Sequence, residues 1–437
     1  MDASAQFRGK KVTVMGLGLL GRGVGDARYL AESGAELIVT DKKSREELAE
    51  SVAQLESFSN VTFVLGEHRL EDFRDRDLVV KAAGVPLDSP YIAEAEKNGI
   101  PVRMSADLFM EIAGITTVGV TGTRGKSTVT HMVHAILKEA GKPVLLGGNV
   151  RGVSTLALLR EVTAESIAVL ELDSWQCQGL GGAALSPQVA VFTTFLPDHA
   201  NYYKDDPGQY LADKSNIFLY QAPGDTLVLG KQCAAMLIEA YGEHIVADTI
   251  IADESKLPHN WTLRVPGVHN RYDAALALAA ARALGVDDAT ARKALESFSG
   301  VPGRLELVAE KDGVQYYNDT NATTPDATAA ALAALGAART VLILGGADKG
   351  LDMGKLTAVL PAVKRVVALA GTGTERIAAD LPEKGMLYRT LPEAFAAARS
   401  AAAPGDAVLL SPAFASFGMF KNEYDRGDQF DALVSQV

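Results

Sequence analysis

Short apolar runs alternate along this chain with longer segments in which apolar residues recur every three or four positions. The runs are rich in Val, Leu and Ile, which is typical of buried parallel strands, and the periodic segments are typical of helices with one buried face. The predicted strands span residues 11–15, 36–40, 77–80, 117–120, 167–170, 189–192, 226–229, 340–344, 366–369 and 407–410. Strands that alternate with helices in this way predict an α/β fold built on mostly parallel sheets.

The strongest chemical signal lies between the predicted strand 117–120 and the periodic segment after it, where residues 121–127 read Thr-Gly-Thr-Arg-Gly-Lys-Ser. A glycine-rich turn between a strand and a helix can cradle phosphates with backbone N–H groups and the helix N-terminus. Lys126 would reach the terminal phosphates, and the Ser127 hydroxyl would bind a magnesium ion. The strict phosphate-loop pattern asks for a glycine five residues before this lysine, so the loop is a compact variant. An ordinary buried turn is the alternative, but the strand before and the helix after meet the context that the motif requires.

A second glycine-rich turn opens the chain. The strand 11–15 runs into Gly-Leu-Gly-Leu-Leu-Gly at 16–21, and the following strand ends in Asp41, twenty residues beyond Gly21. This arrangement matches the dinucleotide-binding fingerprint, in which the acid takes a ribose or a base. Three glycines alone would be weak support for a nucleotide-binding turn, but the strand before them and the acid after them strengthen this interpretation.

Polar residues follow other predicted strands. Glu171 comes after the strand 167–170, where a nucleotide-bound Mg²⁺ needs an oxygen ligand. Asp198 and His199 come after the strand 189–192, and Lys214 lies fifteen residues further on. Each of these residues alone could be structural, but the carboxyl ends of parallel strands meet at one edge of a sheet. We therefore expect their loops to share one crevice.

The second half of the chain carries further polar loops, at 318–323, 345–350 and 411–416, each after a predicted strand. Binding sites on open α/β sheets form in such loops. His269 and Asn270 open an alanine-rich helix, which they would cap if they do not bind a ligand. Arg304, just past the turn-rich segment 299–303, would be either an anion clamp or a surface charge.

Composition narrows the class of protein. The 437 residues are enough for about three domains, and the net charge of −12 argues against general nucleic-acid binding. Two cysteines cannot make a disulfide framework, which fits a reducing cytosol. The first ten residues lack a hydrophobic signal core, and no apolar run approaches the length of a membrane span. We expect a cytoplasmic monomer that binds neither nucleic acid nor a membrane.

Together these motifs resemble the Mur ligases, the ATP-dependent amide-forming enzymes of peptidoglycan synthesis, and look most like the MurD type, which adds glutamate to UDP-N-acetylmuramoyl-L-alanine. The resemblance covers nearly the whole chain. The matching segments are 121–127, 147–149, 198–199, 318–319, 348–349, 411–413, 420–422 and 425–427.

The resemblance implies three domains: a Rossmann-like N-terminal domain (1–113) for the UDP-sugar, a central phosphate-loop ATPase-like domain (114–302) for ATP and Mg²⁺, and a Rossmann-like C-terminal domain (303–437) for the amino acid. The residues that it assigns to the UDP-sugar are Gly18, Leu19, Leu20, Asp41, Asn149, Ser174 and Gln176. Those assigned to ATP are Gly122, Thr123, Arg124, Gly125, Lys126, Ser127, Thr128, Asn270, Arg304 and Asp319.

The same resemblance implies two Mg²⁺ ions, one held by Ser127 and Glu171 and a second by His199 with Lys214, whose amine would be carbamylated. The catalytic residues would be Lys126, Glu171, His199 and Lys214. Thr323, Lys349 and Ser416 would bind the incoming glutamate, with D-glutamate as the expected substrate. The reaction would pass through an acyl phosphate and release ADP and phosphate.

Six residues at five places depart from the usual glutamate-ligase pattern. The departures are Asp173 for serine, Thr194 for asparagine, Asp273 for asparagine, Asn321 for lysine and Glu423-Tyr424 for an aromatic residue followed by an acid. A cation lost and an acid gained near the amino-acid pocket would weaken binding of a dicarboxylate. Lys349 and a further group would then supply the positive charge.

Other functions fit less of the chain. A related ligase, such as a folylpolyglutamate synthase or another Mur enzyme using L-glutamate or a different amino acid, would leave the first glycine-rich turn and the segment 420–422 without a role. An NAD-binding oxidoreductase would leave the phosphate loop unexplained. A catalytically inactive nucleotide-binding protein would not need Lys126, Glu171, His199 and Lys214 together.

Overall fold

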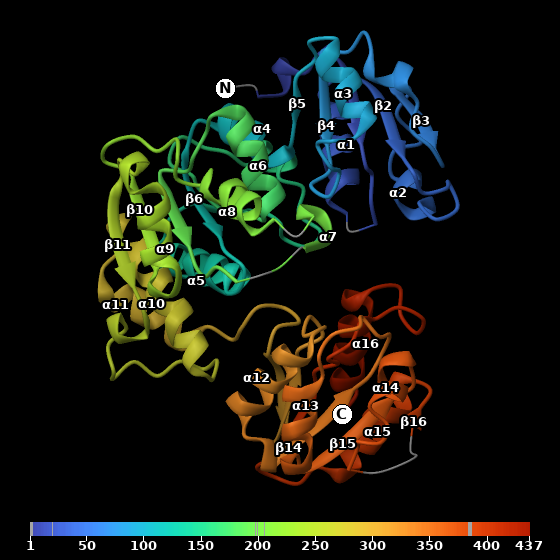
Figure 1. The fold of residues 1–437 in the computed structure, drawn as a ribbon, viewed down its shortest axis with the longest axis vertical. Coiled ribbons are helices and arrows are strands. Elements are labelled where there is room, and N and C mark those ends of the chain that lie inside the picture. The colour runs from blue at the N-terminus through green and yellow to red at the C-terminus, as the bar shows by residue number, and fades with distance from the viewer. Residues whose placement is uncertain (1–2, 20, 197, 199, 205, 383–386) are drawn as a thin grey trace. The chain divides into compact units, whose positions relative to one another are not determined.

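A computed structural model describes residues 3–19, 21–196, 198, 200–204, 206–382 and 387–437 (Figure 1). The chain forms two compact units, one made of Met1–Asn260 with Tyr272–Leu295 and the other of Trp261–Arg271 with Glu296–Val437. The first unit contains two sheets and the second contains one. The predicted α/β fold with three sheet-based domains is confirmed, whereas the exact boundaries near residues 113 and 302 stay predictions.

The N-terminal sheet has the order β3-β2-β1-β4-β5, with every pair parallel. Its strands are β1 (Lys11–Met15), β2 (Glu36–Asp41), β3 (Val61–Leu65), β4 (Leu78–Lys81) and β5 (Val102–Arg103). Its helices are α1 (Arg22–Glu32), α2 (Ala49–Ala53), α3 (Pro90–Lys97) and α4 (Ser105–Ala113). The strand order reverses between β1 and β4, so the loops after these two strands flank the crevice where ligands bind in such sheets.

The central sheet has the order β11-β10-β9-β6-β8-β7, again parallel throughout. Its strands are β6 (Thr116–Thr121), β7 (Val144–Gly148), β8 (Ile167–Glu171), β9 (Val189–Phe192), β10 (Thr226–Gly230) and β11 (Asp248–Ala252). Its helices are α5 (Lys126–Glu139), α6 (Ser174–Ala183), α7 (Ala200–Tyr203), α8 (Pro207–Ser215), α9 (Lys231–Tyr241), α10 (Val268–Ala283) and α11 (Asp288–Ser297). Because β6 lies between β8 and β9, the phosphate loop emerges beside Glu171 and the end of β9.

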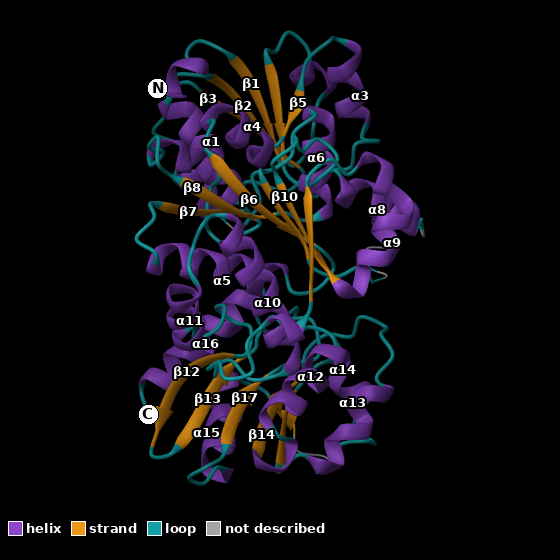
Figure 2. Cartoon of the chain, turned by 90° about the vertical axis from the view of Figure 1, so that its left-hand side faces the viewer, coloured by secondary structure: helices purple, strands orange, loops and turns teal. Residues whose placement is uncertain are grey.

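The third sheet has the order β12-β13-β17-β14-β15-β16. Figure 2 labels four neighbouring strands of it, β12, β13, β17 and β14. Its strands are β12 (Glu306–Lys311), β13 (Val314–Asn318), β14 (Thr340–Leu344), β15 (Arg365–Leu369), β16 (Leu387–Tyr388) and β17 (Ala407–Leu410). β12 pairs antiparallel with β13, and the remaining pairs are parallel. Its helices are α12 (Pro325–Leu335), α13 (Gly354–Val359), α14 (Thr372–Arg376), α15 (Leu391–Ala401) and α16 (Glu423–Ser435).

Short 3₁₀ turns complete the described elements, at Ala3–Gln6, Leu70–Phe73, Leu156–Arg160, Gly242–His244, Glu254–Lys256, Ala337–Arg339 and Leu360–Ala362. The predicted stripe on the helix after the phosphate loop is confirmed, since Val129, Met132, Val133, Ile136 and Leu137 of α5 are all fully buried. Within the described parts of the chain, no helix combines the length and the apolar character that crossing a bilayer would require.

Candidate functional site

The phosphate loop is a tight turn that only glycine can make at two points. Gly122 and Gly125 have φ values of +138° and +86°, and a Cβ on Gly122 would collide with the Thr193 hydroxyl. Thr194 fixes the loop from the adjacent strand end: its carbonyl accepts from Thr123 N at 2.7 Å, and its hydroxyl accepts from Arg124 N at 2.9 Å. Thr194 therefore has a structural role in this chain, because it holds the phosphate loop through two backbone N–H groups.

Two lysine side chains converge on the carbonyl oxygens of this loop. Lys126 Nζ donates to Gly122 O at 3.0 Å and to Thr123 O at 3.2 Å. Lys214 Nζ donates to the same Gly122 O at 3.0 Å and to Thr121 Oγ1 at 3.3 Å. Lys214 is 1% exposed, and burial together with the Lys126 ammonium lowers its pKa to about 7. The loop thus concentrates positive charge where phosphates would bind.

Glu171 ends β8 beside this loop, paired in register with Val120. Its side chain is 4% exposed, and its carboxylate accepts from Asn149 Nδ2 at 3.2 Å. Asn149 N also donates to Glu171 O, at 2.7 Å, so the segment after β7 is tied to the end of β8. These bonds leave carboxylate lone pairs available at the carboxyl edge of the sheet.

The donors near the loop suit Mg²⁺, because the Glu171 carboxylate and the Ser127 hydroxyl are hard oxygen ligands. Mg²⁺ typically takes one or two protein ligands and completes its shell with phosphates and water. The described residues contain no group of three His, Cys, Asp or Glu side chains that could hold a metal alone. The predicted ligand His199 lies outside the described residues.

In the N-terminal glycine loop, the carboxylate of Asp41 accepts hydrogen bonds from backbone N–H groups. Asp41 Oδ2 accepts from Leu17 N at 2.9 Å and from Gly18 N at 3.1 Å, and its Oδ1 accepts from Lys43 N at 2.9 Å. In dinucleotide enzymes the N–H groups of this turn face the pyrophosphate. A diphosphate placed there would meet the buried Asp41 carboxylate, so this geometry disfavours the dehydrogenase alternative.

A cavity of about 350 Å³ connects the two glycine-rich loops within the first unit. Its lining includes Gly16–Leu19 and the segment 82–84 of the N-terminal domain. The central domain contributes Lys126, Asn149, Asp173, Trp175 and Gln176. Four of the residues predicted to bind the UDP-sugar therefore face one cavity: Gly18, Leu19, Asn149 and Gln176. Ser174 lies buried in the first turn of α6, and Leu20 lies outside the described residues.

Asp173 caps the N-terminus of α6, which explains one departure from the family pattern. Its carboxylate accepts from Gln176 N at 2.8 Å, while Gln176 Oε1 accepts from Asp173 N at 3.1 Å. This reciprocal capping box works with aspartate as well as with serine. Gln176 is consequently held in the cavity wall by its own helix.

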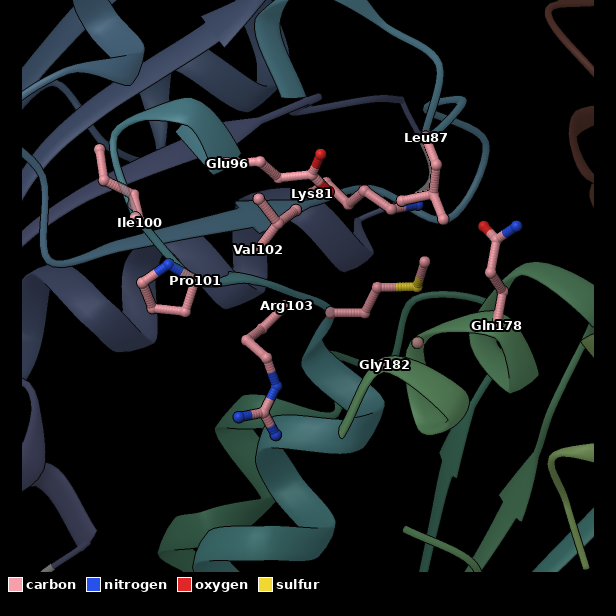
Figure 3. A pocket seen from close by; sticks show the side chains of 12 residues that line it. Lys81, Leu87, Glu96, Ile100, Pro101, Val102, Arg103, Gln178 and Gly182 are labelled. Atoms are coloured by element: carbon pink, nitrogen blue, oxygen red, sulfur yellow. The ribbon is translucent and has the colours of Figure 1, made fainter. Parts of the chain in front are cut away.

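A second cavity, of about 420 Å³, adjoins the first through Lys81 (Figure 3). Lys81 is 4% exposed, extends toward Leu87, and donates to Val85 O at 2.9 Å. Burial lowers the pKa of Lys81 to about 8. Three acids oppose this effect electrostatically: Asp173, Asp107 and Asp213. These acids offset only part of the effect, so burial on balance disfavours the charged form of Lys81.

In the second unit, Asp319 is a buried acid directly after β13 (Val314–Asn318). It accepts from Leu305 N at 3.0 Å and from Ser411 Oγ at 2.7 Å, and burial raises its pKa to about 7. Arg304 is exposed beside it and contributes a favourable charge. Asn270, the third residue of α10, donates from Nδ2 to Pro266 O at 2.6 Å, which differs from the N-cap bond in which a side-chain oxygen accepts from a backbone N–H.

The residues predicted to bind the amino acid lie on neighbouring loops of the third sheet. Lys349 Nζ donates to Thr323 Oγ1 at 2.9 Å, joining the loops after β14 and β13. Ala347 and Ala415 form a bridge between the loops after β14 and β17, which brings the buried Ser416 to the same edge. The three predicted side chains are therefore grouped at one end of this sheet.

Two departures near this group have local explanations. Asn321 Nδ2 donates to Pro302 O at 3.3 Å, which ties the loop 318–323 to the turn-rich segment 299–303. Glu423 opens α16, where an acid interacts favourably with the helix dipole, and its carbonyl accepts from Thr320 Oγ1 at 2.6 Å. Arg426 of the same helix is fully buried and donates to Thr320 O at 2.8 Å.

Asp273, the remaining departure, lies against the phosphate loop. A Cβ on Gly125 would approach Asp273 Oδ1 to 2.5 Å, so the carboxyl group packs directly on the glycine.

The sequence did not predict that Arg22, Lys81 and Trp175 line the cavities of the first unit. Arg22 carried a usable signal, because it directly follows the last glycine of the fingerprint.

Comparisons with known proteins agree along the whole chain. Three family models match it: "Mur ligase MurD-like, N-terminal domain" at residues 10–104, "Mur ligase middle domain" at 120–256 and "Mur ligase, glutamate ligase domain" at 303–414. A UDP-N-acetylmuramoylalanine--D-glutamate ligase from Roseiflexus sp. is 38% identical, over 98% of this chain and 99% of its own length.

A ligase of the same name from Borreliella burgdorferi is 34% identical, over 97% of each chain. Among solved structures, UDP-N-acetylmuramate-alanine ligase MurC from Thermotoga maritima aligns with a TM-score of 0.64, at 19% identity, over 98% of this chain and 99% of its own. MurF ligase from Thermotoga maritima, in complex with ADP, aligns with a TM-score of 0.60 at 18% identity, over 99% of this chain and 97% of its own. At these identities the structures show a shared fold.

Proposed function

The chain belongs to the Mur ligase family, and from this premise we propose that it is an ATP-dependent ligase of peptidoglycan precursor synthesis. It joins D-glutamate to the alanyl carboxylate of UDP-N-acetylmuramoyl-L-alanine and releases ADP and phosphate. The observation that carries this proposal is the cavity lined by the N-terminal glycine turn Gly16–Leu19 at one end and by Lys126 at the other. A uridine at the first end places the far carboxylate of the same substrate near the second.

The reaction begins with attack of the alanyl carboxylate on the γ-phosphorus of ATP. A bond forms from the carboxylate oxygen to phosphorus, and the bond to the bridging oxygen of ADP breaks. Lys126 follows the phosphate oxygens during this transfer, because its ammonium already lies at the loop that cradles them. The product is an acyl phosphate, whose carbonyl carbon is open to a nucleophile.

The amine of glutamate then attacks that carbonyl carbon. The amide bond forms, phosphate leaves with the electrons of the carbon–oxygen bond, and the nitrogen loses a proton. Thr323, Lys349 and Ser416 are suited to hold the glutamate, since they group two hydroxyls and one ammonium at a single sheet edge. Lys349 supplies the cation that Asn321 lacks.

We assign ATP binding to the segment 122–128, with Asn270, Arg304 and Asp319 of the second unit. Mg²⁺, when bound, would neutralise charge on the transferring phosphoryl group. Glu171 and Ser127 would hold one ion, and His199 with Lys214 a second. These assignments rest on the oxygen donors at the loop and on the family to which the chain belongs.

Lys214 is suited to carbamylation because only a neutral amine reacts with carbon dioxide. Its burial lowers its pKa to about 7, so a large fraction of the side chain is neutral at physiological pH. The nitrogen attacks carbon dioxide, forms a carbon–nitrogen bond and loses a proton, which converts an amine into an anionic oxygen donor. The cytoplasmic location and the monomeric state stay predictions from the sequence.

The experiment that tests this function is phosphate release with one component omitted at a time. Release should require UDP-N-acetylmuramoyl-L-alanine, D-glutamate and ATP together. Release that persists without the UDP-linked substrate, or that L-glutamate supports equally, would contradict the proposal.

A further inference from the structure

Arg22 occupies an unusual place in the substrate cavity. It is the first residue of α1, directly after the glycine loop, and it lines the same cavity as that loop and Lys126. Among the described residues its side chain makes one hydrogen bond, in which Nη1 donates to Asn149 Oδ1. A guanidinium carries five N–H donors, so most of them remain available toward the cavity.

Close packing of glycines holds the start of α1 against the central domain. A Cβ on Gly21 would lie 3.4 Å from Gly152 Cα, and one on Gly25 would lie 2.6 Å from Ser154 Cβ. The helix can approach the segment after Asn149 this closely because these positions lack side chains. Arg22 is therefore directed by backbone packing as well as by its bond to Asn149.

No carboxylate in the described part of the chain forms an ion pair with Arg22. Asp26 lies one turn further along α1, and the positive charge of Arg22 slightly opposes the rise in the pKa of Asp26 that burial causes. The Asp26 carboxylate instead accepts from Ser154 Oγ at 2.6 Å and from Leu156 N at 3.3 Å, in the seam between the domains.

The Asp41 carboxylate bound to the glycine loop implies that a diphosphate would need a positively charged side chain nearby. Asp41 takes the N–H groups of Leu17 and Gly18, so these two N–H groups of the loop are not available to a diphosphate. A substrate that carries uridine at one end and a carboxylate near Lys126 must place its two phosphates between these points. Guanidinium is the side chain best matched to paired phosphate oxygens.

We propose that Arg22 binds the diphosphate of the UDP-linked substrate, with Asn149 holding its guanidinium in position. This inference rests on the proposed function, since it assumes a uridine diphosphate substrate. The Asn149 amide has a defined orientation, because Oδ1 accepts from Arg22 while Nδ2 donates to Glu171. Diphosphate binding is thereby linked to the carboxylate beside the phosphate loop.

The test compares UDP with uridine, by calorimetric titration of the full-length protein. In the wild type, UDP should bind more tightly than uridine. Arg22→Gln, which can still donate to Asn149, should weaken UDP binding about tenfold to a hundredfold and leave uridine binding unchanged. Arg22→Lys should retain part of the preference for UDP, and added salt should reduce that preference in the wild type more than in Arg22→Gln.

Arg28→Gln is the matched control, since Arg28 lies on the same helix and its exposed side chain pairs with Glu32 at 2.9 Å. Both ligands should bind this variant as they bind the wild type. Equal weakening of UDP and uridine in Arg22→Gln would show a purely structural role and overturn the inference, as would unchanged UDP binding. A wild type that binds neither ligand would instead refute the proposed function.

Discussion

The two glycine-rich loops of the first unit share a strand–turn–helix backbone, but the charged side chains bound to them have opposite signs. Each follows a central parallel strand, turns on glycines with positive φ, and leads into a helix. In the first loop, the Asp41 carboxylate accepts from backbone N–H groups. In the second, the Lys126 ammonium donates to backbone carbonyls. One loop already contains an anion, and the other already contains a cation.

This difference shows that glycine spacing predicts the turn but not the ligand. A loop whose N–H groups are taken by a carboxylate is suited to a base or a ribose, which carry no charge. A loop whose carbonyls are covered by ammonium groups is suited to phosphates. Asp41 from the neighbouring strand and Lys126 from the following helix therefore determine which kind of ligand each loop can bind.

The largest effect is expected from removing the cation of the second loop. Lys126→Met should lower turnover about a thousandfold, because the charge that follows the transferring phosphoryl group is lost. UDP affinity should stay unchanged, since the first loop is intact. Phosphate release and calorimetric titration measure the two quantities. Lys142→Met, an exposed lysine just beyond the same helix, is the control. A turnover loss below tenfold, or a parallel loss of UDP affinity, would remove the contrast between the loops.

Lys214→Ala should lower turnover about a hundredfold or more, with partial recovery in short carboxylic acids that replace the carbamate oxygens. The wild type should need added bicarbonate most at low pH. The pKa of Lys214 is lowered to about 7, so the neutral amine that can be carbamylated is scarce below that pH and abundant above it. Lys231→Ala serves as the control, because Lys231 is an exposed partner of Asp253. Full activity in Lys214→Ala would exclude Lys214 from the site.

Asp41→Asn tests the first loop. The neutral amide keeps one acceptor oxygen but loses the charge that holds two N–H groups, so uridine affinity should fall about tenfold. The maximal rate of phosphate release at saturating UDP-N-acetylmuramoyl-L-alanine should not respond to this change, whereas the KM for that substrate should rise. Tighter uridine or UDP binding in the variant would mean that the carboxylate obstructs the ligand and does not order the loop.

Asp319 extends the comparison to the second unit, where a buried acid has one N–H and one hydroxyl donor. Burial raises its pKa from 3.8 to about 7, so the folded state prefers the protonated form. The stability that this proton supplies is complete at pH below about 4 and is lost as the pH rises through 7. Asp319→Asn needs no proton and should stabilise the protein by about 1 kcal/mol at pH 8, with no gain at pH 4. Denaturant unfolding at the two pH values measures this, and an equal effect at both would contradict the assigned ionisation.

The sequence predicted the sheets well because their strands are short, buried and rich in aliphatic residues. The predicted runs 11–15, 189–192 and 407–410 coincide with β1, β9 and β17. The predicted runs did not include β3, β5, β7, β11, β12, β13 and β16. In β12, Glu306–Lys311 is half-exposed and charged, and its antiparallel pairing depends on an edge that only the folded sheet defines.

The site was predicted in its residue types and less well in its contacts. Glu171 and Lys126 stand where strand-end reasoning places them, since that reasoning needs only the order of strands. The bond of Arg22 to Asn149 joins residues 127 positions apart and depends on how α1 packs on the central domain. The lowered pKa of Lys214 likewise follows from its burial, which has no local signature in the sequence.

The most direct test of the account is a mass spectrum of the products formed from ATP, D-glutamate and UDP-N-acetylmuramoyl-L-alanine labelled with heavy oxygen in its carboxylate. A ligase that activates this carboxylate at Lys126 should yield the UDP-sugar extended by one glutamyl residue, with label in the released phosphate. Phosphate without label, or phosphate without the extended product, would contradict the central claim that the cavity delivers the substrate carboxylate to the phosphate loop.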